Sequence, residues 1–215
     1  MELKFYNEIT KMEEKYEFIR ELYKVTNGMF YLYKIGNEEV VVKKLDKITD
    51  SEGQFEIDKD LYSYKRLNSL DINIPKLLGY SREENLVVKE YLKGRDVLGF
   101  IKDGILNENI YFELLKYSEL LNSDNLNIDY FPNNFILKDE KLFYINYKVF
   151  PYTEEFNLRN WGIFYWLNSK GIAKYMETND EKYINQNEKR FPIISKELEE
   201  MREDIYFKYL NWKYE

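Results

Sequence analysis

The chain has 215 residues, of which 44% are hydrophobic and 18% aromatic, enough to bury a sizeable core in one domain or in two lobes. It contains neither histidine nor cysteine, which excludes disulfides, His or Cys catalysis and zinc held by these side chains. The formal net charge of −7 disfavours a phosphate-backbone footprint, so we expect no DNA partner. Carboxylate-bound Mg²⁺ is the metal chemistry that stays open.

The composition also bears on where the protein acts. No stretch approaches the ~20 apolar residues that span a bilayer. The segment Met1–Phe5 lacks the basic start and apolar run of a secretory signal. We therefore expect a cytoplasmic protein with no membrane partner.

The first half of the sequence is rich in β-branched and aromatic runs. We predict two strands, a helix and two more strands, over Met29–Ile35, Glu39–Leu45, Gly53–Ser69 (helix), Lys76–Tyr80 and Asn85–Tyr91. Gly36 and Asn37 separate the first two strands, which predicts a β-hairpin. Gly94 ends this part of the chain like a hinge.

The second half is predicted to be mainly helical. Its elements are a helix capped by Asn107, short strands at Phe135–Leu137 and Leu142–Ile145, a buried helix at Asn160–Asn168 and a tail helix at about Ile194–Trp212. The tail helix would bury one stripe, formed by Ile194, Leu198, Met201 and Ile205. The order of elements predicts an α+β fold in two lobes, a β-rich lobe 1–93 and a helical lobe 94–215.

The residues that best support a chemistry lie between Asn127 and Asn146. Asp129 and Asn134 are five residues apart on a loop that leads into a strand, and the following hairpin returns the chain at Asn146. Phosphoryl transfer needs a carboxylate that orients the attacking hydroxyl and oxygen ligands that hold Mg²⁺. The spacing allows Asp129 to be the catalytic carboxylate, with Asn134 and Asn146 as metal ligands.

An Asp, four residues and then an Asn resembles the catalytic loop of the protein-kinase superfamily. The chain is most similar in pattern to its small divergent members, the aminoglycoside and choline phosphotransferases and the minimal kinase of the tRNA threonylcarbamoylation complex. The resemblance covers about Val25 to Asn168 and implies a two-lobed kinase-like fold that uses ATP and Mg²⁺. The segment Asn157–Trp166, with Trp161-Gly162, resembles the buried helix after the activation segment.

The resemblance also implies a phosphate-binding ion pair. Lys43, at the end of Val-Val-Val-Lys, resembles the ATP-binding lysine, with Lys44 as its nearest competitor. Asp60 lies where the family's helix acid pairs with that lysine. Family members carry Glu there, and Glu56, one turn earlier, is the alternative.

Further nucleotide contacts follow from the same resemblance. The segment Val88–Gly94, with Glu90 and Leu92, resembles the hinge whose backbone binds adenine. Thr26-Asn27-Gly28 lies where the phosphate-covering loop belongs, with Gly28 as its single glycine.

Three departures from the family pattern affect the functional interpretation. Asn127 replaces the usual residue two positions before the catalytic Asp, Asn146 replaces the metal-binding Asp, and Asn157 replaces the Asp that anchors the buried helix. An amide offers an oxygen but no charge to Mg²⁺. The loss of that charge is expected to slow transfer by orders of magnitude.

Three interpretations remain open at this point. The chain is an ATP-dependent phosphotransferase, a pseudokinase that binds nucleotide or a protein partner, or an α+β domain unrelated to kinases in which Asp129 is a turn residue. The short segment from Asn146 to Asn157 favours a small-molecule acceptor over a protein. An acidic cluster of Asp129, Glu154 and Glu155 would favour a cationic acceptor such as an amino sugar.

Overall fold

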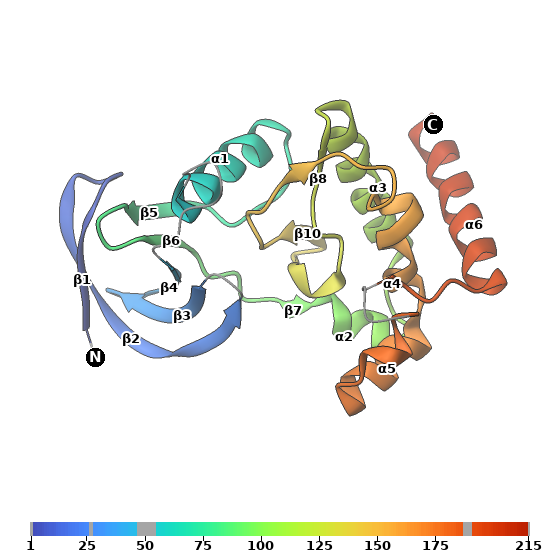
Figure 1. The fold of residues 1–215 in the computed structure, drawn as a ribbon, viewed down its shortest axis with the longest axis horizontal. Coiled ribbons are helices and arrows are strands. Elements are labelled where there is room, and N and C mark those ends of the chain that lie inside the picture. The colour runs from blue at the N-terminus through green and yellow to red at the C-terminus, as the bar shows by residue number, and fades with distance from the viewer. Residues whose placement is uncertain (1, 26–27, 47–54, 187–190, 215) are drawn as a thin grey trace. The chain divides into compact units, whose positions relative to one another are not determined.

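The computed structural model describes residues 2–25, 28–46, 55–186 and 191–214. The chain packs as two compact units, the first comprising Met1–Ser69 and Ile74–Lys93 and the second Leu70–Asn73 and Gly94–Glu215. An antiparallel sheet fills the N-terminal part and helices dominate the C-terminal part (Figure 1). This confirms the α+β class. In the described ranges, no helix is long and apolar enough to cross a membrane.

The first unit is a six-stranded antiparallel sheet accompanied by a helix (Figure 1). Its elements are β1 (Glu2–Asn7), β2 (Met12–Val25), β3 (Gly28–Ile35), β4 (Glu38–Leu45), α1 (Glu56–Ser69), β5 (Leu77–Ser81) and β6 (Leu86–Glu90). The strand order across the sheet is β1-β2-β3-β4-β6-β5. The predicted hairpin and later strands are confirmed to within one or two residues, whereas Gly53, the predicted start of the helix, lies outside the described residues.

Sequence reasoning missed β1 and β2. The 14-residue β2 leaves most of its side chains exposed or half-exposed and has one buried residue, Tyr16. A strand with so little alternation between buried and exposed positions lacks the period-two apolar signal that predicts strands. Its place in the sheet is fixed by pairing with β1 and β3.

One face of this sheet forms the hydrophobic core of the first unit. Val40, Val42 and Val88 alternate with residues of the other face and are almost fully buried. They belong to one cluster with Leu3, Phe5, Tyr16, Tyr33 and Leu86. The Phe5 and Tyr16 rings stack with centroids 5.2 Å apart. This aromatic packing covers the face of the β-hairpin that does not carry Lys43.

The two edge strands of the sheet meet at the end of β1. The Asn7 side-chain amide donates to the Leu78 carbonyl over 3.2 Å, and the Glu8 backbone N–H donates to the Tyr80 carbonyl over 2.9 Å. These bonds join β1 to β5, so the sheet curls back on itself. Backbone groups at the edges of the sheet could otherwise pair with another chain, and here they are hydrogen-bonded within the same chain.

The second unit combines helices with two small sheets. Its elements are β7 (Arg95–Asp96), α2 (Val97–Lys102), α3 (Glu108–Ser123), β8 (Leu126–Asn127), β9 (Phe135–Lys138), β10 (Lys141–Tyr144), β11 (Phe150–Pro151), α4 (Ile163–Leu167), α5 (Ser169–Thr178) and α6 (Lys196–Lys213). The sheets have the orders β10-β9-β7 and β11-β8. Asn107 caps α3 by accepting a hydrogen bond from the Asn109 backbone N–H, as predicted.

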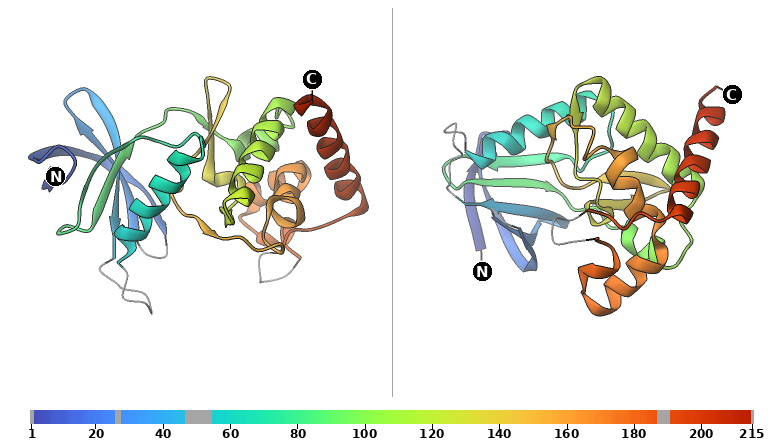
Figure 2. Two further views of the ribbon diagram at one scale, coloured as in Figure 1. Left: turned by 90° about the horizontal axis from the view of Figure 1, so that it is seen from above. Right: turned by 45° about the vertical axis from the view of Figure 1, so that its right-hand side comes forward.

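The C-terminal helix α6 lies alongside α3 (Figures 1 and 2). The Tyr209 hydroxyl donates to Glu119 over 2.9 Å. The predicted apolar stripe is wrong in part, because Ile194 and Met201 are each 40% exposed and the buried residues of the helix are Leu198 and Tyr209. Tyr209, an aromatic residue with a hydroxyl group, therefore takes the place of the aliphatic contacts that were expected from Ile194 and Met201.

Candidate functional site

The structure pairs the predicted lysine and acid in the first unit. Lys43 on β4 donates to both carboxylate oxygens of Asp60 on α1, with Nζ to Oδ1 and Oδ2 distances of 2.8 and 2.6 Å. The two side chains are 5% and 3% exposed. A charged pair taken this far from water is retained only with good geometry, and it is a weak source of stability.

The two alternatives to this pair make other contacts. The Glu56 carboxylate accepts from the Lys59 ammonium over 3.0 Å. Lys44 pairs in register with Met29 and its ammonium lies 6.0 Å from the centre of the Tyr31 ring. Successive residues of a strand point to opposite faces, so Lys44 lies on the face opposite to Lys43.

A second buried lysine, which sequence reasoning missed, shares the face of Lys43. Lys89 on β6 is 4% exposed and pairs in register with Val41, two residues before Lys43. The ammonium groups of Lys43 and Lys89 lie 5.6 and 5.0 Å from the centre of the Phe30 ring. The signal was present in the sequence, because Lys89 directly follows the apolar run Leu-Val-Val.

Burial and charge both act on Lys89. Desolvation and the nearby Lys43 ammonium lower the pKa of Lys89 to about 7, while the Asp60 carboxylate acts in the opposite direction. This face of the sheet therefore carries a lysine whose protonation changes near neutral pH.

The remaining predicted nucleotide contacts lie at the ends of the same strands. Gly28 pairs with Leu45 on β4, and a Cβ atom there would lie 2.4 Å from the Lys44 carbonyl oxygen, so this position admits no side chain without a shift of the backbone. Thr26 and Asn27 lie outside the described residues.

Glu90 ends β6, where its backbone N–H donates to the Lys76 carbonyl over 2.9 Å. Leu92 follows as a buried residue, 4% exposed, beyond the end of the strand.

In the second unit, the three polar residues of the predicted transfer centre are linked by hydrogen bonds. The Asn134 amide donates to the Asp129 backbone carbonyl over 3.2 Å, and the Asn146 amide donates to Asn134 Oδ1 over 3.4 Å. The backbone N–H of Ile145 donates to the Asn134 carbonyl over 2.9 Å. The Asp129 carboxylate accepts from the Phe131 backbone N–H over 3.0 Å, which fixes its direction.

The loop that carries Asp129 is supported from α4. The Trp166 indole donates to the Tyr130 backbone carbonyl over 2.7 Å, and both residues are almost fully buried. A Cβ atom at Gly162 would lie 2.4 Å from the Tyr130 Cβ, so glycine lets this turn approach the loop. Neither contact was foreseen beyond the prediction of a buried helix.

Two of the three departures from the kinase pattern have local roles. Asn157 caps its own helix, because its oxygen accepts from the Asn160 backbone N–H over 2.7 Å, and its amide donates to the Tyr152 hydroxyl. Asn127 is 4% exposed, pairs in register with Phe150 in the β8–β11 sheet, and its amide donates to the Thr153 carbonyl.

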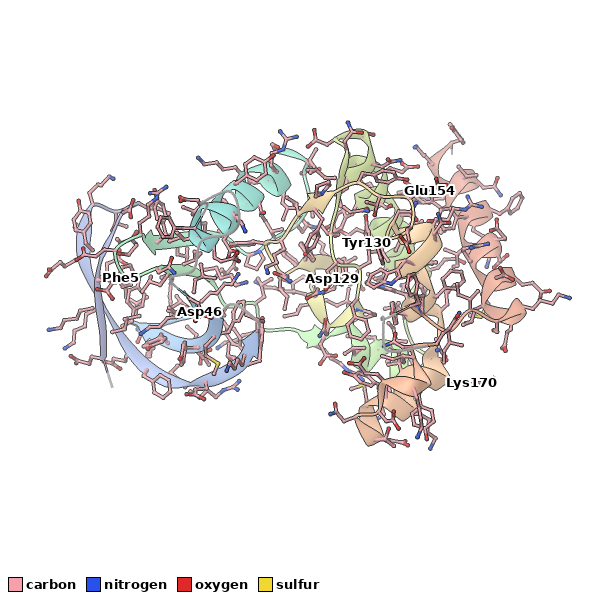
Figure 3. All side chains as sticks on the ribbon, in the orientation of Figure 1. Phe5, Asp46, Asp129, Tyr130, Glu154 and Lys170 are labelled. Atoms are coloured by element: carbon pink, nitrogen blue, oxygen red, sulfur yellow. The ribbon has the colours of Figure 1, made fainter. Side chains whose placement is uncertain are left out.

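The expected acidic cluster does not form. Figure 3 shows Glu154 well separated from Asp129, and Glu154 and Glu155 are exposed. Within the described ranges, no three acidic side chains are grouped so that they could hold a metal ion. The prediction of a cluster of Asp129, Glu154 and Glu155 is therefore wrong, because the chain between Asn146 and Asn157 leads these glutamates away to the start of the π-helical turn Leu158–Gly162.

A polar pocket of about 380 Å³ in the second unit involves α3, α6 and the segment that carries Glu154. Two of its charged side chains are already engaged. Glu119 accepts from Lys213 over 2.7 Å, and Arg159 donates to Glu203 over 2.9 Å. These bonds join α6 to α3 and to the turn Leu158–Gly162.

The side-chain oxygens available at the Asp129 loop limit how it could bind a metal ion. Asn134 and Asn146 each offer a neutral oxygen, and Asp129 offers the single carboxylate of the hydrogen-bonded group. Mg²⁺ dehydrates reluctantly and is usually held by one or two carboxylates together with substrate phosphates. These residues suit a metal ion that arrives on a polyphosphate better than one held by the protein by itself.

Comparison of the chain with models of known protein families finds no match, and comparison with curated proteins likewise finds none.

Proposed function

We propose that the chain is a kinase-like protein that binds ATP and descends from phosphotransferases, with a two-lobed kinase-like fold. The observation that carries the proposal is the buried Lys43–Asp60 pair, which joins a sheet lysine to a helix acid at 2.6 Å. In protein kinases an ion pair between such a strand lysine and a helix acid must be in place for phosphoryl transfer. Because buried ion pairs contribute little to stability, function is the better reason for this one.

Residues 1–93 would bind the nucleotide. Lys43 would contact the α- and β-phosphates, and the resemblance to kinases assigns Gly28 to the loop that covers them. Glu90 ends β6, where it pairs with Val40, and Leu92 follows the strand; backbone groups of a hinge would contact adenine here.

Residues 94–215 would carry the transfer step, with Asp129 as the catalytic base. The acceptor hydroxyl oxygen forms a bond to the γ-phosphorus, the bond from that phosphorus to the bridging oxygen breaks, and its electron pair leaves with ADP. The hydroxyl proton passes to the Asp129 carboxylate. The orientation of this carboxylate by the Phe131 N–H supports the role, because a base must be aimed before transfer.

Mg²⁺ would neutralise charge on the transferring phosphate, and Asn134 and Asn146 would each offer it one oxygen. The absence of a carboxylate at residue 146 predicts slow transfer, because these ligands add no charge to the site. A small-molecule acceptor remains our proposal, since the segment between Asn146 and Asn157 is short.

One observation favours a second candidate, a pseudokinase that binds nucleotide or a protein partner without transfer. Asn146 presents an N–H group to Asn134 Oδ1, the oxygen that would otherwise face a metal ion. An aspartate at this position would present only acceptors. The amide pair therefore favours a state in which the transfer centre is closed to Mg²⁺.

Substitution of Asn146 by aspartate separates these two candidates. We expect the wild-type protein to bind ATP, and Asn146→Asp to raise ATP turnover in the presence of Mg²⁺ by about 100-fold, the scale of one charge-stabilising interaction at a transferring group. Isothermal titration calorimetry measures the binding, and release of ADP measures the turnover. Asn133→Asp, which adds a carboxylate at an exposed neighbour in the same loop, is the matched control.

The role of Asp129 is tested by Asp129→Asn, which keeps an oxygen acceptor for the Phe131 N–H and removes the charge. Wild-type turnover that disappears in this variant would eliminate the pseudokinase candidate. Failure of both the wild-type protein and Asn146→Asp to bind ATP, with or without Mg²⁺, would sink the proposal as a whole.

A further inference from the structure

The polar pocket beside α3 and α6 carries hydrogen-bonding groups that the second unit leaves open. Its volume of about 380 Å³ lies in the range of ~300–1,000 Å³ that is usual for small-molecule sites. Among the described residues, the Tyr206 hydroxyl and the side-chain amide of Asn122, both of which line the pocket, find no hydrogen-bond partner. These groups are free to bind a molecule that enters it.

A buried hydroxyl without a partner lies beside the same pocket. Tyr130 is fully buried, and its hydroxyl makes no hydrogen bond within the part of the chain that the structure describes. Burial raises the pKa of Tyr130, and the Ser118 hydroxyl, which lines the pocket, acts on it in the opposite direction. Two more lining residues, Tyr152 and Tyr206, interact with Tyr130 electrostatically. The Tyr130 hydroxyl therefore lies among the residues of the pocket wall.

A buried polar group that lacks a partner is costly, so we expect the Tyr130 hydroxyl to be bonded by something outside the chain. Its pKa is raised, so it stays protonated near neutral pH and can both donate and accept. A polar cavity of this size has room for ordered water or for a larger molecule with hydroxyl groups.

The charges on the pocket wall decide which class of molecule fits. Glu119 accepts from Lys213 over 2.7 Å, and Arg159 donates to Glu203 over 2.9 Å. The remaining charged lining residue, Glu154, is exposed. An ionic ligand would compete with these ion pairs, whereas a neutral one would use the open hydroxyl and amide groups. The pocket therefore favours a neutral molecule whose groups both donate and accept hydrogen bonds.

We propose that this pocket binds a small, neutral, hydroxyl-rich molecule, a polyol or a monosaccharide, and that the Tyr130 hydroxyl is one of its hydrogen-bond partners. In Figure 3 Tyr130 lies between Asp129 and the lining residue Glu154. Because Tyr130 directly follows Asp129 in the chain, a ligand bound here would hold the residue next to the proposed catalytic base. The site itself does not depend on nucleotide binding.

Isothermal titration calorimetry with myo-inositol, a polyol, and with glucose, a monosaccharide, measures the binding. We expect the wild-type protein to bind at least one of them with a dissociation constant of about 1 mM or below, the scale for a ligand of this size. Tyr130→Phe keeps the ring and removes the hydroxyl. It should weaken binding by about 5-fold or more, as expected for the loss of one hydrogen bond.

Tyr117→Phe is the matched control. Tyr117 is buried like Tyr130, but its hydroxyl donates to the Leu142 carbonyl over 2.7 Å. This variant should change the affinity by less than about 2-fold and should lower the urea concentration at the midpoint of unfolding, because it removes a bond within the chain. Without ligand, Tyr130→Phe should leave that midpoint unchanged or raise it. A lower midpoint in Tyr130→Phe would mean that the protein itself bonds this hydroxyl and would overturn the inference.

The other outcomes are equally decisive. No binding of either compound by the folded wild-type protein at about 10 mM, ten times the expected dissociation constant, would leave water as the partner of Tyr130 and overturn the proposal. Binding that Tyr130→Phe does not weaken would place the ligand elsewhere. Tighter binding of putrescine, a diamine, or of citrate, a polyanion, would overturn the assignment to a neutral ligand. ATP binding is measured separately, so none of these results decides the proposed function.

Discussion

At the scale of single residues, the buried lysines are the most informative feature of the chain. Lys43 has a carboxylate partner at 2.6 Å. Lys89 shares the same face of the sheet, and burial together with the Lys43 ammonium lowers the pKa of Lys89 to about 7. An ammonium group that is removed from water destabilises the folded state when it is protonated. Burial of Lys89 therefore makes the stability of the folded protein depend on pH.

The pH dependence of stability tests this account of Lys89. The pKa of about 7 in the folded protein is depressed from the usual value of about 10.4 for an unfolded chain. Between these values the unfolded chain binds more protons, so the free energy of unfolding should rise as pH increases from 7. Lys89→Met should remove this rise and increase stability near pH 7 by a few kcal/mol, on the order of the shift itself.

Urea denaturation between about pH 7 and pH 9 measures the effect, a window below the usual pKa of tyrosine. Lys44→Met serves as the control and should keep the wild-type slope. If the slope in Lys89→Met equals that of the wild type, the lysine is not the titrating group.

At the scale of elements, the Asp129 loop is held by α4 and by the β9–β10 hairpin. The Trp166 indole bonds the Tyr130 carbonyl, and the N–H of Ile145, just after the hairpin, bonds the Asn134 carbonyl. These backbone anchors fix a loop whose polar side chains carry the proposed chemistry. Loops that are positioned by rigid elements are the usual location of such residues.

Trp166→Phe tests the support from α4. The variant removes the indole donor, leaves the buried Tyr130 carbonyl without this bond and opens a small cavity, so it should lower the free energy of unfolding by about 1–3 kcal/mol. Urea denaturation measures the change. Trp212→Phe, at a tryptophan that is 48% exposed on α6, should cost less than about 0.5 kcal/mol. Equal effects of the two variants would contradict the anchoring role of Trp166.

At the scale of the whole molecule, the chain has two compact units, and each contains fully buried apolar side chains. Leu86 of β6 belongs to the hydrophobic cluster of the first unit, and Leu114 of α3 lies in the second unit; both residues are fully buried. Compact units of one chain are expected to open separately in the native state.

Two matched substitutions test this independence. Leu86→Ala and Leu114→Ala should each lower stability by about 2–5 kcal/mol, because each leaves a cavity in a packed core. In hydrogen–deuterium exchange measured by mass spectrometry, Leu86→Ala should speed exchange in the first unit and Leu114→Ala in the second. Faster exchange throughout the chain in either variant would show that the two units open together.

The sequence by itself determined the elements in which polar and apolar side chains alternate or repeat at regular intervals. The β3–β4 hairpin and the Asn107 cap of α3 were predictable, because each depends on neighbours within a few residues. The spacing of Asp129, Asn134 and Asn146 could be read directly from the sequence. Asp60 was expected from the family resemblance, with Glu56 as the alternative, and the contact between β4 and α1 decides for Asp60.

Only the tertiary structure decided which distant residues share a face. Lys89 joins Lys43 because β6 pairs with β4, Trp166 supports the Asp129 loop from another element, and Glu154 is carried away from Asp129. The physical reason is that strand pairing and burial, which fix these positions, depend on contacts between segments far apart in the chain. The same contacts bury Lys89, which is 4% exposed.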